Sequence, residues 1–247
     1  MSERYFVDPR IVDDRARLVG VEAHHLVHVM RGRPGDRVTL FDGSGLEFTA
    51  EVSELRRDEV ELKVVARHEA DRELAFRLTL AVALPKGDRQ RWLVEKAVEL
   101  GVARVIPLRT ARSVAKPGRG AIQRMARWVV DASKQCGRNR LMEIGEPRTW
   151  SDLLADSNEI PLRILAHPTP KDPACGNDAD FEFLRVPAGH PRDEVIAAIG
   201  PEGGFTSEEV AAAREADWRA VNLGPRTLRI ETAATVLASL VMTHRGC

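Results

Sequence analysis

Two stretches near the end of the chain decide the fold: Val195–Phe205 (VIAAIGPEGGF) and Ala220–Ala233 (AVNLGPRTLRIETA). In each, an apolar run of the length of a buried parallel strand leads into a glycine turn, and a helical pattern follows. Glycine lets backbone amides approach a ligand closely because it has no Cβ. Open α/β sheets bind their ligands at the carboxyl ends of their strands. The two turns therefore predict a cofactor site built from main chain.

Apolar runs of strand length alternate with helical patterns through most of the chain. The expected strands lie at 78–84, 104–108, 162–166, 195–199 and 220–223, and the expected helices at 92–100, 119–136, 206–216 and 231–244. Asp88 is expected to cap the first of these helices and Gly101 to end it. Strands that alternate with helices predict a parallel, doubly wound α/β sheet.

The start of the chain shows a different pattern. Polar and apolar residues alternate there with the period of strands, at 38–41, 47–52 and 60–65. Several short strands joined by close turns predict a small β-barrel. The charged stretch 69–73 separates the two patterns, so we expect a barrel domain over residues 1–72 and an α/β domain over residues 73–247.

The composition argues against several classes of protein. The 247 residues carry no net charge, and no apolar run approaches the length of a membrane span. No apolar signal segment follows the first residues, so we expect a cytoplasmic protein. Cys136, Cys175 and Cys247 are odd in number and widely spaced, which argues against a disulfide framework or a zinc pair. His24 and His28 have the spacing of a helical metal pair but lack further ligands, and we expect no metal.

Basic residues are concentrated between Arg109 and Arg140. Nine lysines and arginines stand against a single acid, Asp131, in this stretch. Such a local excess of positive charge is what a polyanion-binding face needs, even in a protein without net charge. A solvated helix face is the alternative explanation.

The glycine turns fit neither common nucleotide-binding motif. No Gly-Lys-Ser/Thr follows them, which excludes a Walker A loop, and they lack the spacing of the dinucleotide fingerprint. They resemble instead the two signature blocks of the ribosomal small subunit RNA methyltransferase E family, in the SPOUT class of S-adenosylmethionine-dependent methyltransferases. Further blocks resemble the family in the same order along the chain: Arg4–Phe6, His25–Arg31, Leu84–Arg89, Glu99–Val102, Arg112–Ser113 and Gln135–Arg140.

The resemblance implies a fold, an activity and an assembly. Members of this family methylate N3 of one uridine in 16S ribosomal RNA within the small ribosomal subunit. They combine a small PUA-like barrel with a parallel α/β domain whose C-terminal segment forms a deep trefoil knot, and they act as homodimers. The knot follows from the resemblance alone, because general topology rules would exclude it.

The resemblance also places S-adenosyl-L-methionine against three loops. The expected contacts are Leu165, Ala166, His167, Gly200, Pro201, Glu202, Gly203, Gly204, Leu223, Gly224, Leu228, Arg229 and Thr232. Main-chain groups at turns can meet adenine and the methionine amino group, which explains the glycines. This chain departs from the family at Ala166, where leucine is usual. A second departure is the stretch 167–192, whose five prolines predict a long loop that is either functional or disordered.

Two residues are expected to take part in the chemistry. A sulfonium is a good leaving group, so positioning is expected to supply most of the rate. Arg229 is expected to stabilise negative charge on the uracil carbonyls. Glu231, or Glu202 in its place, is expected to accept the N3 proton or to hold an arginine that orients the base. The structural alternative is an ion pair of Arg229 and Glu231 at the start of the last helix.

RNA contacts are expected from basic and polar residues along the chain: Arg4, Arg31, Lys86, Arg89, Arg112, Gln135, Arg138 and Arg140. Contacts to phosphate give affinity without sequence choice. The choice of a single uridine must then come from the shape of the ribosome and from an extruded base.

Two other functions remain open at this point. One is a SPOUT methyltransferase that acts on a different RNA. The other is a non-catalytic ribosome-assembly factor that binds RNA. Cofactor binding separates the second from an enzyme, because a pure scaffold has no need of the glycine turns.

Overall fold

The computed structural model describes residues 3–114, 117–168, 184 and 194–245, which belong to two compact units. The first unit holds Met1–Glu73 together with Val130–Leu141, and the second holds Leu74–Val129 and Met142–Cys247. Helix α3 (Arg119–Cys136) therefore starts in the second unit and ends in the first. Nothing in the sequence pattern indicated this return of the chain to the first unit.

A five-stranded sheet with the order β1-β3-β4-β5-β2 forms the first unit. Its strands are β1 (Arg4–Phe6), β2 (Arg15–Val19), β3 (Arg37–Phe41), β4 (Leu46–Leu55) and β5 (Glu59–Glu69). Helix α1 (Gly20–His24) and a π-helical turn (His25–Val29) follow β2. Alternate strand residues enter one apolar core, which includes Tyr5, Leu40, Phe48 and Leu62. This core explains the period of two in the sequence.

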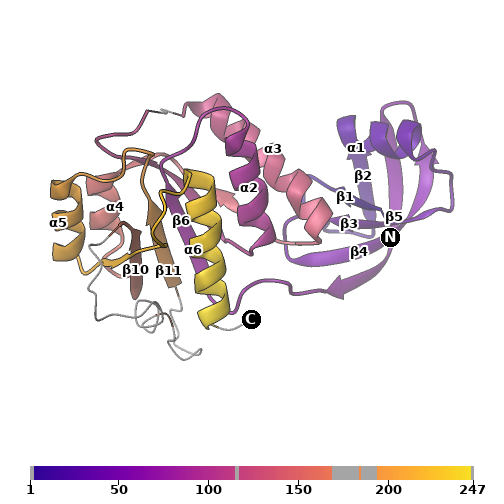
Figure 1. Cartoon of the computed structure of the whole chain (residues 1–247). Coiled ribbons are helices and arrows are strands. Elements are labelled where there is room, and N and C mark those ends of the chain that lie inside the picture. Colours follow the sequence, from indigo (N-terminus) through magenta and orange to yellow (C-terminus); the bar gives the residue numbers. More distant parts are fainter. Residues whose placement is uncertain (1–2, 115–116, 169–183, 185–193, 246–247) are drawn as a thin grey trace. The chain divides into compact units, whose positions relative to one another are not determined.

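A parallel sheet of seven strands forms the centre of the second unit, in the order β12-β10-β11-β6-β7-β8, with β9 paired to β7 (Figure 1). Its strands are β6 (Arg77–Val82), β7 (Arg104–Arg109), β8 (Glu143–Ile144), β9 (Arg148–Thr149), β10 (Leu162–Ala166), β11 (Glu194–Ile199) and β12 (Arg219–Val221). The apolar runs predicted as parallel strands all lie in this sheet.

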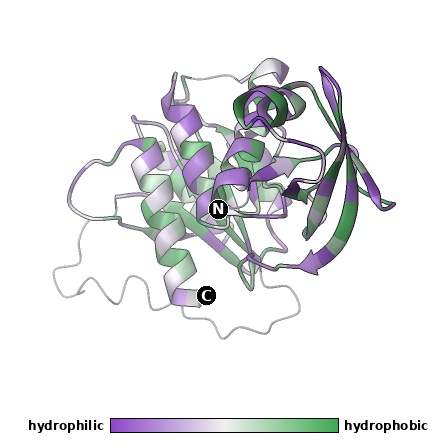
Figure 2. Cartoon of the chain, turned by 90° about the vertical axis from the view of Figure 1, so that its right-hand side faces the viewer, coloured by the Kyte–Doolittle hydropathy of each residue, from purple (hydrophilic) through white to green (hydrophobic). Residues whose placement is uncertain are grey.

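Helices cover both faces of this sheet. They are α2 (Arg89–Glu99), α4 (Trp150–Asp156), α5 (Ser207–Glu215) and α6 (Ile230–Arg245), besides α3. Helix α6, which is largely hydrophobic in Figure 2, packs against α2, β6 and β11. An aromatic cluster packs on the opposite face, where Trp150 lies 4.8 Å from Phe205 and 5.3 Å from Trp218 between ring centroids. The α/β class is confirmed, and the trefoil knot stays a prediction.

The two ends of α2 differ in how well the sequence predicted them. Gly101 has a φ of 76°, a left-handed conformation that favours glycine after a helix. Asp88 precedes the helix, but its side chain makes no capping hydrogen bond, so the predicted cap is wrong. The reason is its backbone, since φ −64° and ψ −19° are helical values rather than the extended ones of a capping residue.

Several sequence-based expectations concern features of the whole chain. Among the described residues, no helix is both long and apolar enough to cross a membrane. The same residues contain no group of three or more His, Cys, Asp or Glu side chains arranged to hold a metal ion. Cys136 is a free thiol, whereas Cys175, Cys247 and nearly all of the predicted loop at 167–192 lie outside the described residues.

Helix α5 begins with a capping box that can be tested. The Thr206 hydroxyl accepts a hydrogen bond from the Glu209 amide at 3.2 Å, and the Glu209 carboxylate accepts one from the Thr206 amide at 2.9 Å. We expect Thr206→Ala to lower the free energy of unfolding by about 1 kcal/mol in urea denaturation. Thr243→Ala, at an exposed hydroxyl within α6, is the control and should change it by less than about 0.5 kcal/mol. Equal effects of the two substitutions would contradict the role of the cap.

Candidate functional site

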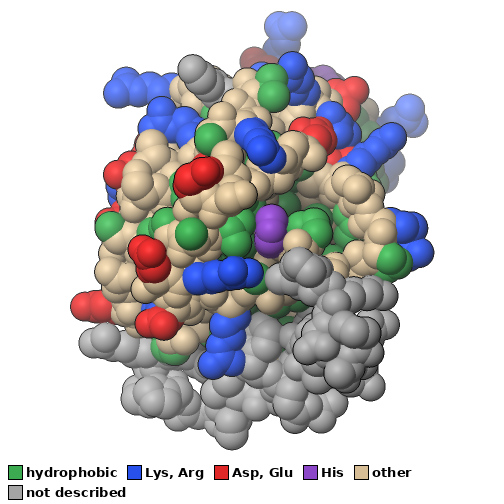
Figure 3. Space-filling model, turned by 60° about the vertical axis from the view of Figure 1, so that its left-hand side comes forward, with side chains coloured by type: hydrophobic (Ala, Val, Ile, Leu, Met, Phe, Trp, Pro, Cys, Tyr) green, Lys and Arg blue, Asp and Glu red, His purple; other side chains and the backbone are tan. Residues whose placement is uncertain are grey.

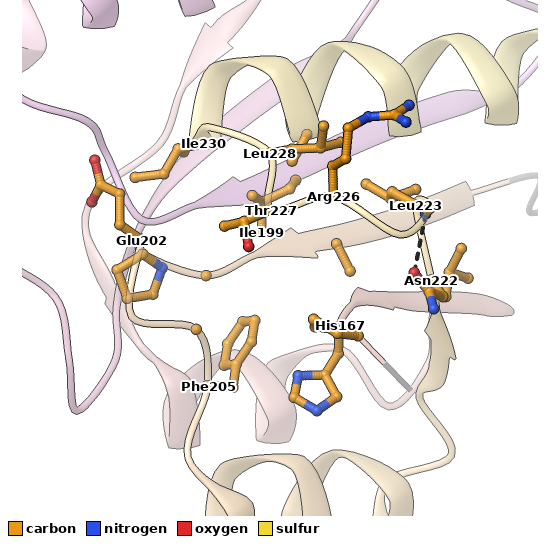
Figure 4. A pocket seen from close by; sticks show the side chains of 18 of the residues that line it. His167, Ile199, Glu202, Phe205, Asn222, Leu223, Arg226, Thr227, Leu228 and Ile230 are labelled. Carbon is orange, nitrogen blue, oxygen red and sulfur yellow. Dashed lines mark hydrogen bonds between the residues drawn. The ribbon is translucent and has the colours of Figure 1, made fainter. Parts of the chain in front are cut away.

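A cavity of about 200 Å³ lies at the carboxyl ends of β10, β11 and β12, and we call it the strand-end cavity (Figure 4). Three loops line it, one after each strand, together with the start of α6. The lining residues are Ala166, His167, Pro168, Ile199, Gly200, Pro201, Glu202, Gly204, Phe205, Val221, Asn222, Leu223, Gly224, Pro225, Arg226, Thr227, Leu228, Ile230 and Ala233. The three loops are those that the sequence predicted for a cofactor.

The register of the sheet brings these loops together. Ala166 pairs with Ile199 of β11 and with Val221 of β12, so the three strands end at one level. The amide of His167 then donates to the carbonyl of Val221 at 3.0 Å, which continues the ladder into the first loop. Loops that leave neighbouring parallel strands at one level must enclose a common space.

Two glycines are required for the shape of this cavity. A Cβ on Gly200 would lie 2.8 Å from the ring of Phe205, so a larger residue would displace that ring. Gly224 has a φ of 114°, which L residues rarely adopt, and its amide donates to the Asn222 side chain at 3.0 Å (Figure 4). Gly200 therefore lets the Phe205 ring lie close to the backbone, and Gly224 lets the chain adopt the turn conformation.

His167 is the ionisable ring in the wall of the strand-end cavity, where it lies beside Phe205 in Figure 4. Burial lowers the pKa of His167, and the positive charge of Arg214 lowers it further. The imidazole is therefore neutral near pH 7. Its Nδ1 is buried and has no hydrogen-bond partner among the described residues, so it is available to a ligand.

A second cavity of about 170 Å³ adjoins the first, and we call it the cationic cavity. It is lined by Ala83, Leu84, Lys86, Arg89, Ser113, Val114, Pro201 and Glu202. Pro201 and Glu202 also line the strand-end cavity, so the Gly200 turn forms a wall common to both.

Two carboxylates hold Arg89 at this wall. The guanidinium Nη1 lies 3.2 Å from Glu202 Oε1 and 3.8 Å from Glu231 Oε2. Glu231 is only 7% exposed, and its Oε2 accepts no hydrogen bond within the described part of the chain. A buried carboxylate needs a positive partner, and Arg89 supplies it. Both carboxylates considered in the sequence analysis, Glu202 and Glu231, therefore lie near Arg89, and their roles in the reaction stay predictions.

The structure brings most of the predicted cofactor residues to the strand-end cavity. Ala166, His167, Gly200, Pro201, Glu202, Gly204, Leu223, Gly224 and Leu228 line it, whereas Leu165, Gly203, Arg229 and Thr232 do not. Leu165 points instead into the core between the sheet and the aromatic cluster. The sequence did not single out Ile199, Phe205, Val221 or Asn222, although a position at a strand end or next to a glycine turn would have indicated them.

The two predicted catalytic residues lie next to each other in sequence but in different surroundings. Arg229 is exposed, and its side chain forms no ion pair with any described residue. Glu231 is buried and lines neither cavity. The ion pair of Arg229 with Glu231, considered as a structural alternative, is absent from the described part of the chain because Glu231 pairs with Arg89.

Two of the predicted RNA-binding arginines form internal ion pairs in the first unit. Arg4 pairs with Glu47 and donates to the Asn139 side chain at 2.7 Å. Arg138 is 4% exposed and donates to Glu73 at 3.0 Å through Nε. The contact of Arg4 with Asn139 attaches the segment 130–141 to β1, and that of Arg138 with Glu73 attaches it to the stretch after β5, which explains why the segment belongs to the first unit.

The other predicted RNA-binding residues are more accessible. Arg31, Arg112, Gln135 and Arg140 are exposed, as is Lys86 at the cationic cavity. Arg112 also donates to the carbonyl of Gly203 at 2.6 Å, which ties it to the Gly200 turn. Figure 3 shows one face of the molecule, where hydrophobic side chains surround a histidine and both basic and acidic side chains stand around them. Such a mixture suits a ligand with an apolar body and polar or charged groups.

Family models cover both parts of the sequence. Residues 72–242 match the model of an RNA methyltransferase domain, and residues 20–65 match that of an RNA methyltransferase PUA domain. The ribosomal RNA small subunit methyltransferase E of Bacillus subtilis is 31% identical over 229 residues, which cover 91% of this chain and 88% of that protein.

Solved structures agree with these matches. The ribosomal RNA small subunit methyltransferase E of Neisseria gonorrhoeae, bound to S-adenosyl methionine, superposes with a TM-score of 0.82 at 27% identity over 99% of this chain and 98% of its own. A putative methyltransferase from Legionella pneumophila, in complex with the same cofactor, superposes with a TM-score of 0.87 at 28% identity over 100% and 99%. The resemblance stated from the sequence is thereby confirmed, and the chain belongs to the ribosomal RNA small subunit methyltransferase E family.

Proposed function

We propose that this protein transfers a methyl group from S-adenosyl-L-methionine to N3 of one uridine in 16S ribosomal RNA, within the small ribosomal subunit. One observation carries the proposal: a cavity made by three strand-end loops lies next to a cationic cavity and shares the Gly200 turn with it. A methyl donor and an acceptor base must lie in adjacent spaces, because reacting atoms have to approach to about 3–3.5 Å.

The strand-end cavity fits the proposed cofactor. Ile199, Phe205 and Leu228 supply apolar walls for adenine and the ribose carbons. The glycine turns leave main-chain groups accessible, and the unpaired Nδ1 of His167 offers a further polar contact. The relatives from Neisseria gonorrhoeae and Legionella pneumophila were solved with this cofactor. When bound, it supplies a methyl group on a positively charged sulfur.

Three residues near the wall common to both cavities have different roles in methyl transfer. Arg229 has no ion pair among the described residues, so its guanidinium is available to stabilise charge on the uracil carbonyls. Glu231 holds Arg89 in place rather than accepting a proton, because it is buried and lines neither cavity. Glu202 lines both cavities and takes the proton from N3.

The resemblance supports further proposals about the whole molecule. We expect a cytoplasmic homodimer with a PUA-like domain over residues 1–72, a SPOUT domain over residues 73–247 and a trefoil knot at its C-terminal end. Exposed basic residues such as Arg31, Arg112 and Arg140 contact RNA phosphates and position the small subunit.

Mass spectrometry of ribosomal RNA tests the proposed function. Small subunits from cells that lack this protein are incubated with the purified protein and isotopically labelled S-adenosyl-L-methionine. We expect the label in N3-methyluridine at one position of 16S RNA. Label in transfer RNA or in the large subunit would support the alternative substrate instead. Absence of label from every RNA, with cofactor binding intact, would contradict an enzyme of this kind.

Arg229→Ala separates catalysis from cofactor binding. Because the guanidinium is expected to act on charge that develops in the transition state, its loss should lower methyl transfer by about 100-fold or more. The dissociation constant for S-adenosyl-L-methionine should stay within about threefold, since Arg229 does not line the strand-end cavity. Arg148→Ala, which removes an exposed guanidinium paired with Asp156, is the matched control. Unchanged turnover of Arg229→Ala would refute the role.

A further inference from the structure

The cationic cavity lies at the ends of the strands that neighbour the cofactor loops in the sheet. Ala83 and Leu84 follow β6, Ser113 and Val114 follow β7, and Pro201 and Glu202 follow β11. These strands are neighbours in the order β11-β6-β7. The sheet therefore forms a second space at the same edge, and the proposed cofactor leaves it free.

The two cationic side chains of this cavity differ in whether carboxylates compensate their charge. Arg89 lies between two carboxylates, at 3.2 Å from Glu202 and 3.8 Å from Glu231, so its charge is compensated. Lys86 is exposed, and no carboxylate of the described residues lies within 4.0 Å of its Nζ. Lys86 therefore carries the uncompensated positive charge of the cavity.

We propose that the cationic cavity holds the uracil ring of the target nucleotide and that Lys86 is a catalytic residue. This inference rests on the proposed function. The Watson–Crick edge of uracil presents a carbonyl, the N3–H and a second carbonyl. Lysine and arginine only donate hydrogen bonds and a carboxylate only accepts, so Lys86, Glu202 and Arg89 offer the complementary set of groups. Cytosine has an amino group and no hydrogen on N3, and the same set would reject it.

The composition of the cavity favours the base over a phosphate group. Half of its lining residues (Ala83, Leu84, Val114 and Pro201) are apolar, which suits the faces of a ring and not a phosphate. Glu202 would also repel a phosphate. Finally, the wall common to both cavities puts this space beside the methyl donor, and only the reacting base needs to be there.

Glu202 and Lys86 have different roles in the chemical step. N3 gives its proton to the carboxylate of Glu202 and its electron pair to the methyl carbon. The bond from that carbon to sulfur breaks, sulfur keeps the pair, and S-adenosylhomocysteine leaves as a neutral thioether. As the N3 proton departs, negative charge spreads onto both carbonyl oxygens. The ammonium of Lys86 stabilises it within the cavity, and Arg229, which lines neither cavity, adds to this through its charge at longer range.

Lys86→Met tests the inference, because it removes the charge and keeps most of the aliphatic chain. Methyl transfer to small subunits is measured from pH 6.5 to pH 10, together with the melting temperature, the KM for subunits and the dissociation constant for the cofactor. We expect kcat at pH 7 to fall about 100-fold and to recover as the pH rises, since deprotonation of N3 then needs less assistance. The KM and the cofactor affinity should stay within about threefold. Lys86→Arg should keep kcat within about tenfold, because it keeps the charge.

Lys96→Met is the matched control, since Lys96 pairs with Glu99 on α2 and lines neither cavity, and it should behave as the unmodified protein. A Lys86→Met protein with a higher KM but the same kcat would overturn the inference, because it would make Lys86 a phosphate contact. A fall in kcat that is equal at every pH would also overturn it. If the unmodified protein binds the cofactor but methylates no uridine, the proposed function fails and this inference fails with it.

Discussion

The site depends on one constraint, which is that three parallel strands end at the same level of the sheet. Ala166, Ile199 and Val221 lie at one level of the sheet, so the loops that follow them start side by side. Neighbouring strand residues point to opposite faces, and a slip by one residue would move the buried side chains of β10 and misalign every loop. Core packing therefore determines the shape of the strand-end cavity, and buried side chains such as Ile199, Phe205 and Val221 line it directly.

Ion pairs decide which basic residues are available to RNA. Arg4 and Arg138 each have a carboxylate partner in the first unit, and Arg89 has two in the second. Arg138 is only 4% exposed, so removal of Glu73 would leave a buried charge without compensation, and in all three cases the ion pair holds the guanidinium in place. Lys86 and Arg229 have no such partner among the described residues, which leaves them, like the exposed Arg31 and Arg140, available to a negatively charged substrate.

The sequence predicted the strands and loops of the site better than the contacts between side chains that are distant in the sequence. Short apolar runs before glycines predicted the strands and the loops that line the strand-end cavity, because a buried parallel strand leaves a local pattern. The pairing of Arg89 with Glu231 joins residues far apart in the chain, and no local pattern reports such a contact. The return of Val130–Leu141 to the first unit could not be predicted from the sequence for the same reason. It depends on the contacts of Arg138 with Glu73 and of Arg4 with Asn139.

Calorimetry of S-adenosyl-L-methionine with Gly200→Ala tests most directly whether main-chain loops at the strand ends bind the cofactor. The added methyl group would lie 2.8 Å from the Phe205 ring and displace this ring, which lines the cavity. We expect an affinity lower by about fivefold or more, since such overpacking costs about 1–3 kcal/mol. Gly118→Ala, where a Cβ meets nothing within 4 Å, should bind as the unmodified protein does. Equal affinity of the two variants would contradict binding of the cofactor by these loops.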